Sequence, residues 1–513
     1  MADYNFLLET RLSQDQQLAL QILQRVCRGA GLNVYLTGGP MRDLLAGQPV
    51  RFLNCTTEGD PVGLAAKLQA EGAERLSAHP EQHSLNLSLR GCRIRLAAAS
   101  GPAGVGTIVE DLRGRGLTLN SIGLSLNPGS RGLPLDPTNG AADIEARLIR
   151  MNHPYVFLEE PIVLLRTVRL ATRLQFAVEE RTQARMESAR EGNYVAQATP
   201  VARGQEFEAI AYDPDPAAVL RALEKEQWLE AAFGKGVRTA KMNLGGLARL
   251  TATVESWEQL GLSADVGLVA MPLLLGGLAP ADQARLAKLL PSRHLGTEWK
   301  KVRAEAEGVE KRLLALPSGG ATPWLRRAQE AIEKTLPEGV IYASLEPSNA
   351  KAGKKLKEFQ AQAQQLRQRL PLGVLRGLGL APHSLEAEEI LRPWYRRLLN
   401  GESLSDTELA EGLRGAVAAT RPAPPPPPTT AGKAAKTGAK AATRGGVPAG
   451  PLPPPLPAIP AAPAAVGGKA VAKPAPKLAA KPAPARANGS ANKPAAPARH
   501  KPAPPVKKKK ASK

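Results

Sequence analysis

The sequence predicts an α+β fold, in which a small mixed-sheet domain precedes an all-helical region and a disordered C-terminal tail. Short β-type runs alternate with helical runs between about residues 12 and 143. From about residue 145, apolar residues recur with the 3.6-residue period of helices. The last part consists mostly of Pro, Ala and Lys and has little apolar surface to bury. We therefore predict domains at 1–144, 145–415 and 416–513.

The N-terminal domain is predicted to begin with a helix, which is followed by a strand, a short helix, a second strand and a hairpin. The expected elements are a helix at Ser13–Arg28, a strand at Val34–Leu36, a short helix at Met41–Ala46, a strand at Val50–Cys55, and hairpin strands at Leu85–Leu89 and Cys92–Leu96. Gly38-Gly39 joins the first strand to the short helix, an order that brings backbone amides and Arg42 near a phosphate. Taken alone, the same pattern is also typical of an ordinary strand-to-helix turn.

The helical region is predicted from its periodicity alone. Its expected helices are Ile162–Leu174, Ala217–Phe233, Leu244–Leu260, Pro280–Leu290, Glu298–Leu316, Trp324–Lys334, Asn349–Leu370 and Leu385–Leu399. Many of them carry basic residues, which usually form a solvated face and can also form an RNA-binding surface.

Gly38-Gly-Pro-Met-Arg-Asp43 and Thr56-Thr-Glu-Gly59 form the first of four motifs that occur in order and together resemble the tRNA nucleotidyltransferase and bacterial poly(A) polymerase family. The first segment matches the family's Gly-Gly-x-x-Arg-Asp, and the second matches its Thr-Thr-x-Gly. Between them, the family's Asp-x-Asp pair is replaced by Phe52 and Asn54. The other similar segments are Glu110–Ser121, Asp136–Gly140 and Glu159–Leu170.

The resemblance implies a nucleotidyltransferase head, a helical neck, body and tail region that binds RNA, and a set of site residues. The positions that it implies for nucleotide or phosphate binding are Gly38, Gly39, Arg42, Asp43, Arg115, Asn120, Glu159 and Glu160. Arg166 and Arg169, on one face of a helix, are implied for RNA binding, with a solvated basic stripe as the alternative.

The two missing aspartates bear on catalysis. Carboxylates at i and i+2 lie on one face of a strand and can hold the metal ions that align a nucleophile and a triphosphate. Phenylalanine cannot ligate a metal, and a neutral asparagine is a poor ligand for a hard cation. Val163 also replaces the arginine that the family uses to read the base. We therefore predict weak or lost catalysis, with no metal and no cofactor.

In an alternative hypothesis, the chain retains nucleotidyltransferase activity. Glu58 with Asp60 could rebuild a shifted metal site, and Mg²⁺ with CTP or ATP would then be required. Against this, Thr57 or Asp60 is well placed to cap a helix at Val62–Ala70.

Cysteine use and hydropathy predict the compartment. The 513-residue chain has three scattered cysteines and no Cys-x-x-Cys, which favours a reducing compartment and argues against structural zinc. No secretory signal is visible near Asp3 and Glu9, and the longest apolar run, Val266–Leu278, is too short to span a membrane. We expect a cytoplasmic protein.

The tail from Arg421 to Lys513 holds 18 lysines and arginines and no acidic residue, so it supplies 18 of the formal net charge of +21. Such a segment suits non-specific, salt-sensitive contact with phosphate backbones. The favoured hypothesis is a catalytically impaired member of the family that binds RNA, with tRNA or another RNA 3′ end as the partner. The alternatives are an active enzyme that adds CMP or AMP to RNA 3′ ends, and a nucleic-acid-binding protein that acts through its tail.

Overall fold

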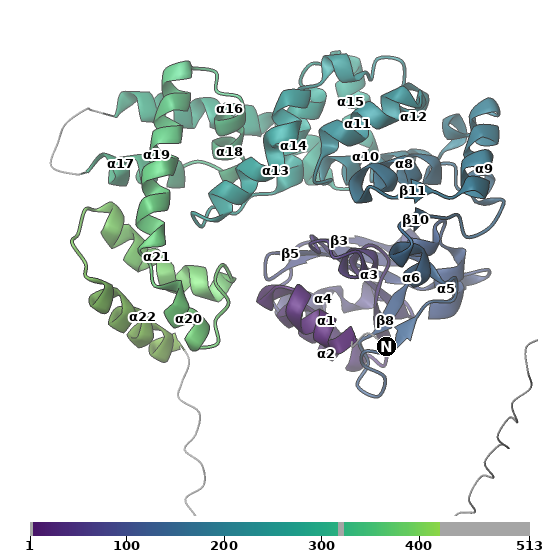
Figure 1. The fold of residues 1–513 in the computed structure, drawn as a ribbon, viewed down its shortest axis with the longest axis horizontal. Helices are drawn as coiled ribbons and strands as arrows, with labels where there is room; N and C mark the ends of the chain where they lie inside the picture. Colours follow the sequence, from purple (N-terminus) through teal and green to yellow (C-terminus); the bar gives the residue numbers. More distant parts are fainter. Residues whose placement is uncertain (1–3, 317–322, 421–513) are drawn as a thin grey trace, which may run out of the picture. The chain divides into compact units, whose positions relative to one another are not determined.

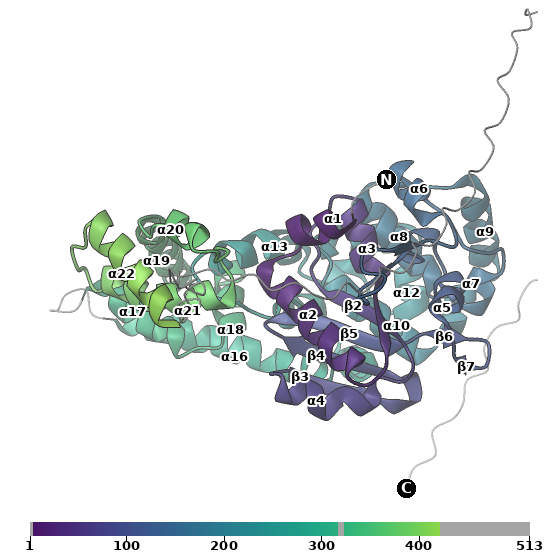
Figure 2. The ribbon, with the colours of Figure 1, turned by 90° about the horizontal axis from the view of Figure 1, so that it is seen from below.

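A seven-stranded sheet forms the centre of the N-terminal part of the computed structural model, which describes residues 4–316 and 323–420 (Figures 1 and 2). The strand order is β3-β4-β5-β2-β1-β8-β9, with β2 and β5 parallel and the other neighbours antiparallel. The strands are β1 Asn33–Thr37, β2 Leu53–Glu58, β3 Glu74–His79, β4 Ser84–Leu89, β5 Cys92–Ala98, β8 Gly123–Ser125 and β9 Pro134–Leu135. The predicted mixed sheet is confirmed.

Helices cover one face of this sheet, where the apolar side chains point. They are α2 (Gln14–Arg28), α3 (Gly39–Leu45) and α4 (Ala65–Ala70). Leu36, Leu53 and Leu96 are fully buried there. Helix α2 starts where it does because Ser13 and Gln16 form a reciprocal capping box.

The opposite face of the sheet is polar near its centre. Strand residues alternate between faces, so Asn54 and Thr56 on β2 project away from the apolar core. Thr37 on β1 and Arg95 on β5 lie on the same polar face, because Arg95 pairs in register with Asn54. Helix α5 (Ile108–Gly114) covers part of this face through a small apolar cluster around Tyr35.

The chain then continues almost entirely as helices. After α6 (Gly140–Glu145), they are α7 Val156–Glu159, α8 Val163–Leu174, α9 Glu180–Glu191, α10 Pro200–Ala211, α11 Pro216–Lys225, α12 Trp228–Phe233, α13 Leu244–Glu258, α14 Val266–Leu275, α15 Pro280–Leu289, α16 Arg293–Ala315, α17 Trp324–Glu333, α18 Pro337–Leu345, α19 Ala350–Gln368, α20 Leu372–Gly377, α21 Leu385–Leu399 and α22 Asp406–Thr420. The described residues belong to one compact unit.

Several predicted boundaries were wrong, and α16, expected from Glu298, already begins at Arg293. Two others have a local physical reason. The strand expected at Val50–Cys55 lies at Leu53–Glu58, because Val50 is buried in the loop and does not join the ladder. The single helix expected at Ala217–Phe233 is broken into α11 and α12 by Gln227, whose φ of 62° interrupts the helical backbone.

The hairpin closed at Arg90-Gly91 is confirmed, with φ values of 50° and 72° at these residues. Among the described helices, none is long and apolar enough to cross a membrane. The predicted disordered basic tail lies outside the described residues.

Candidate functional site

The turn at Gly38 joins β1 to α3 and lies under the side chain of Arg115. Gly38 has a φ of 68°, and a Cβ built there would lie 2.6 Å from Arg115 Nη1. Arg115 donates to the backbone oxygen of Asn120 at 3.1 Å and to the hydroxyls of Thr37 and Thr56 at 3.0 and 3.1 Å. It also pairs with Asp111, from Nη2 to Oδ2, at 2.6 Å. Glycine is therefore required at position 38 for both backbone conformation and space.

Arg42 and Asp43 form a buried ionic network at the same helix. Arg42 Nε donates to Asp43 Oδ1 at 2.9 Å, and its Nη1 donates to Asn120 Oδ1 at 2.8 Å. Asp43 Oδ2 accepts from Arg173 Nη2 of α8 at 2.8 Å. Burial lowers the pKa of Arg42, with Asp43 opposing this effect and Arg173 adding to it. The network joins α3 to α8 and to the turn at Asn120.

The two residues at the positions of the family's aspartate pair have different surroundings. A Cβ at Gly39 would lie 3.3 Å from Phe52 Cζ, so the Phe52 ring packs against the glycine turn. Asn54 lies on the polar face of the sheet, in register with Arg95. Neither residue offers a charged oxygen, and the nearest strand partner of Asn54 is a cation. These residues do not fit a pair of divalent metal ions.

The alternative carboxylates, Glu58 and Asp60, have local partners. Glu58 accepts from Asn33 Nδ2 at 3.1 Å, from the Tyr35 hydroxyl at 3.1 Å and from the amide of Ile108 at 3.1 Å. Asp60 accepts from the amide of Val62 at 2.9 Å and contacts His83 Nδ1 at 2.9 Å. The capping role predicted for Thr57 or Asp60 was wrong, because the 3-10 turn Val62–Leu64 follows Pro61 and α4 follows Leu64, neither with a side-chain cap. Asp60 instead closes a local turn onto Val62. The described part of the chain contains no group of three or more His, Cys, Asp or Glu residues that could hold a metal.

Two other motif positions contact one another. Gly116 stands where the family's Arg-Arg-Asp has its aspartate, and Val163 stands where Glu-Asp-x-x-Arg has its arginine. A Cβ at Gly116 would lie 2.7 Å from Val163 Cγ2 and 3.1 Å from Val156 Cγ2. Val163 is fully buried. An apolar contact therefore fills the space between two motifs that both lack their charged residue.

The remaining candidates differ in exposure. Glu159 is exposed and lies 3.7 Å from His153, while Glu160 lies 3.4 Å from Arg166. Arg166 is partly exposed and also contacts Glu206 at 3.4 Å.

Arg169, by contrast, is buried. It lies 2.6 Å from Glu206 and 3.6 Å from Asp213. Burial alone would raise the pKa of Glu206, but Arg169 and Arg166 lower it. Of the two arginines assigned to RNA binding, Arg166 presents more of its side chain to solvent, 24% against 11% for Arg169.

Two arginines that the structure places in this region were not singled out in the sequence analysis. Arg173 follows Arg166 and Arg169 on the same face of α8, and the i, i+3, i+7 spacing could have indicated it. Arg95 alternates with the apolar residues of β5, which could have placed it on the polar face.

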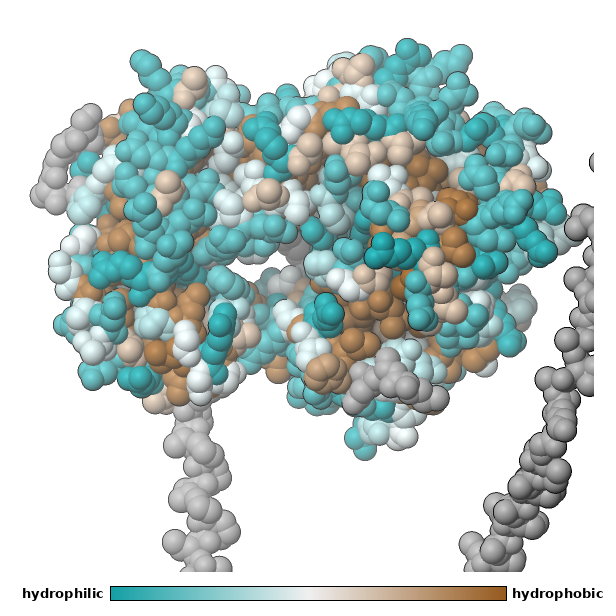
Figure 3. Space-filling model, in the orientation of Figure 1, coloured by the Kyte–Doolittle hydropathy of each residue, from teal (hydrophilic) through white to brown (hydrophobic). Residues whose placement is uncertain are grey.

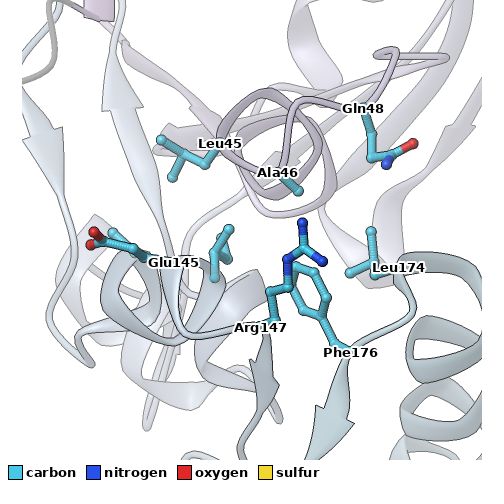
Figure 4. Close-up of a pocket in the computed structure, with 9 residues that line it drawn as sticks. Leu45, Ala46, Gln48, Glu145, Arg147, Leu174 and Phe176 are labelled. Carbon is cyan, nitrogen blue, oxygen red and sulfur yellow. The ribbon is translucent and has the colours of Figure 1, made fainter.

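A cavity of about 460 Å³ lies at the opposite end of α3 from the Gly38 turn (Figure 4). Leu45, Ala46 and Gln48 line it from α3 and the turn after it, and Glu145, Arg147 and Phe176 are among its other lining residues. Figure 3 shows hydrophobic residues gathered on the face where α3, α6 and α8 are drawn. None of the candidate site residues lines this cavity.

Comparison with known proteins places these motifs in context. The Poly A polymerase head domain family matches residues 34–150. The A-adding tRNA nucleotidyltransferase of Halalkalibacterium halodurans is 26% identical over 242 residues, which are 44% of this chain and 56% of that protein. The protein of the same name from Aquifex aeolicus is 29% identical over 171 residues, 31% of this chain and 20% of that protein.

The Multifunctional CCA protein of Thioalkalivibrio sulfidiphilus is 32% identical over 298 residues, which are 53% of this chain and 68% of that protein. The match thus covers more than two thirds of this relative, whereas it spans 56% and 20% of the two A-adding proteins.

Proposed function

This chain belongs to the tRNA nucleotidyltransferase and poly(A) polymerase family, and we propose that it binds tRNA, or another structured RNA 3′ end, with little or no nucleotide addition. The relatives named above are tRNA nucleotidyltransferases and a CCA protein. The head retains the sheet and the glycine turn, which supports a ligand of the same class.

The observation that carries the proposal is the chemistry of the polar sheet face. Phe52 and Asn54 supply no carboxylate there, and Asn54 faces Arg95 across the parallel strand pair. Metal ions contribute several kcal/mol to phosphoryl transfer, and about 1.4 kcal/mol corresponds to a tenfold change in rate. Loss of both ligands therefore favours binding over catalysis.

The packing of Val163 on Gly116 supports the same proposal. Base selection by the family's usual route needs a hydrogen-bonding side chain at position 163, and valine has none. A site that cannot pair with the base edge loses discrimination between nucleotides steeply. In our proposal, the helical region provides the RNA-binding surface, and the basic tail adds affinity that does not depend on sequence.

We expect deletion of residues 421–513 to weaken tRNA binding without abolishing it. The deleted segment holds 18 cations, and each phosphate contact that it makes adds to the salt dependence of the affinity. The slope of log K against log salt should therefore become flatter. Fluorescence anisotropy with labelled tRNA, from about 50 to 200 mM salt, measures both quantities.

The matched comparison is duplex DNA under the same conditions. The full chain should prefer tRNA at the upper end of the salt range, where non-specific contacts are weakest. Loss of all binding on deletion, or equal affinity for duplex DNA at high salt, would instead assign nucleic-acid binding to the tail.

A further inference from the structure

The polar face of the sheet carries an arginine whose charge no carboxylate neutralises directly. Arg95 is partly buried on β5, beside Asn54 of β2. Among the described residues, no ion pair or hydrogen bond is found for its guanidinium. A partly buried guanidinium without a counter-charge is available to an anionic ligand, which would offset part of the cost of burying the charge.

The neighbouring arginines differ from Arg95 because each has its own carboxylate. Arg93 pairs with Glu208 at 3.2 Å, and Arg115 pairs with Asp111 at 2.6 Å. Arg166 contacts Glu160 and Glu206, both at 3.4 Å. Asp111 and Glu208 do favour the charged form of Arg95, but their short contacts are to other arginines.

The surroundings of Arg95 are electropositive. Burial lowers its pKa, and the nearby Arg115 and Arg166 lower it further through repulsion between like charges. Arg95 thus shares its surroundings with a head arginine and with an arginine of α8. The hydroxyls of Thr37 and Thr56, already bonded to Arg115, border the same face.

We propose that Arg95, with Arg115 and Arg166, forms a metal-independent binding site for a phosphate group on the sheet face where the family's aspartate pair would lie. Planar guanidinium groups recognise phosphate through charge-assisted, bidentate hydrogen bonds. Here the chain itself supplies the positive charge that phosphate requires, in place of a divalent cation. The phosphate can come from a nucleoside triphosphate or from the RNA backbone, and it is the shared chemistry that the site recognises.

The test compares wild-type full chain with Arg95→Gln in EDTA, using ATP and a tRNA transcript lacking its 3′ end as separate probes. Hydrogen bonds to charged groups contribute about 1.5–3 kcal/mol, so at least one of the two affinities should fall roughly 10- to 100-fold. Arg95→Lys keeps the charge without the planar fork and should restore part of the loss.

The control is Arg131→Gln, which removes one exposed arginine whose side chain contacts Gln24. Its affinities should stay within about twofold of wild type, since an isolated exposed charge contributes little. The assay uses raised salt, because the tail's charges are then screened.

A second variant leaves Arg95 in place. Asn54→Asp puts a carboxylate in register with Arg95, and the new ion pair should weaken phosphate binding as Arg95→Gln does. This variant also tests the proposal if Arg95→Gln does not fold.

The outcomes identify the source of the phosphate and separate the phosphate site from the proposed tRNA binding. Loss of ATP affinity alone identifies a nucleotide phosphate, and loss of tRNA affinity alone identifies the RNA backbone. Unchanged affinities in Arg95→Gln and Asn54→Asp would overturn the phosphate site while leaving tRNA binding intact. The phosphate site rests on and extends the proposed function. Failure of the wild-type protein to bind tRNA would count only against the proposed tRNA binding. The ATP probe tests the role of Arg95 independently.

Discussion

Replacing Val163 with arginine is expected to lower the free energy of unfolding by roughly 3–5 kcal/mol, since the new guanidinium would be buried without a partner. Val163 is fully buried and packs against Gly116. Urea denaturation followed by circular dichroism measures the change. Full stability in this variant would show that the space is open to solvent, contrary to the packing described here.

The same contact can be probed without introducing charge. Gly116→Ala should cost about 1–3 kcal/mol by overpacking, because the added methyl would meet Val163 and Val156. Combining it with Val163→Ala should cost less than the sum of the two single changes, because the valine methyls would be gone.

The control lies two residues away. Gly114 has no neighbouring atom within 4 Å of a built Cβ, so Gly114→Ala should be neutral or slightly stabilising. Equal effects at the two glycines would contradict the proposed contact. If the two substitutions are not additive, the replacements at positions 116 and 163 depend on each other. Restoring the family's arginine at position 163 alone would then not restore recognition of the nucleotide base.

The substitution Asp43→Asn should be the other strongly destabilising change. The Asp43 carboxylate, whose side chain is 2% exposed, accepts from both Arg42 and Arg173. A neutral amide in its place would leave two buried guanidiniums without a counter-charge, at a cost of roughly 3–5 kcal/mol. The midpoint of chemical denaturation reports this loss.

Asp60→Asn is the matched control, because it makes the same change in an exposed pair with His83, both side chains being 46% exposed. Its effect should stay within about 1 kcal/mol. Loss of ligand binding in Asp43→Asn at unchanged stability would instead assign the Arg-Asp motif to the ligand.

Local signals explain which parts of the fold could be predicted. The helix at Ser13–Arg28 is predicted from its apolar periodicity and the first strand from the glycines that follow it. Both predictions lie within one or two residues of the observed bounds. The start of β2 could not be predicted from neighbouring residues in the sequence, because it depends on pairing with β1 and on the burial of Val50 in the loop. The break at Gln227 has no Gly or Pro to mark it.

The candidate site was predictable only as a set of motif positions. That Asp43 pairs with Arg173, 130 residues further along the chain, depends on tertiary packing. The contact between Gly116 and Val163 and the register of Asn54 with Arg95 depend on it in the same way. Whether the nucleotide- and RNA-binding positions act as the family resemblance implies stays a prediction.

Incorporation of labelled CTP and ATP into tRNA lacking its 3′ end, with Mg²⁺ or Mn²⁺ and alongside binding of the same tRNA, tests most directly whether this chain binds without catalysing. An active tRNA nucleotidyltransferase serves as the positive control. We expect tight tRNA binding, with incorporation at least about 1000-fold below the control, as loss of several kcal/mol of metal stabilisation requires. Turnover comparable to the control, abolished by Glu58→Gln or Asp60→Asn, would establish a rebuilt metal site and contradict this expectation.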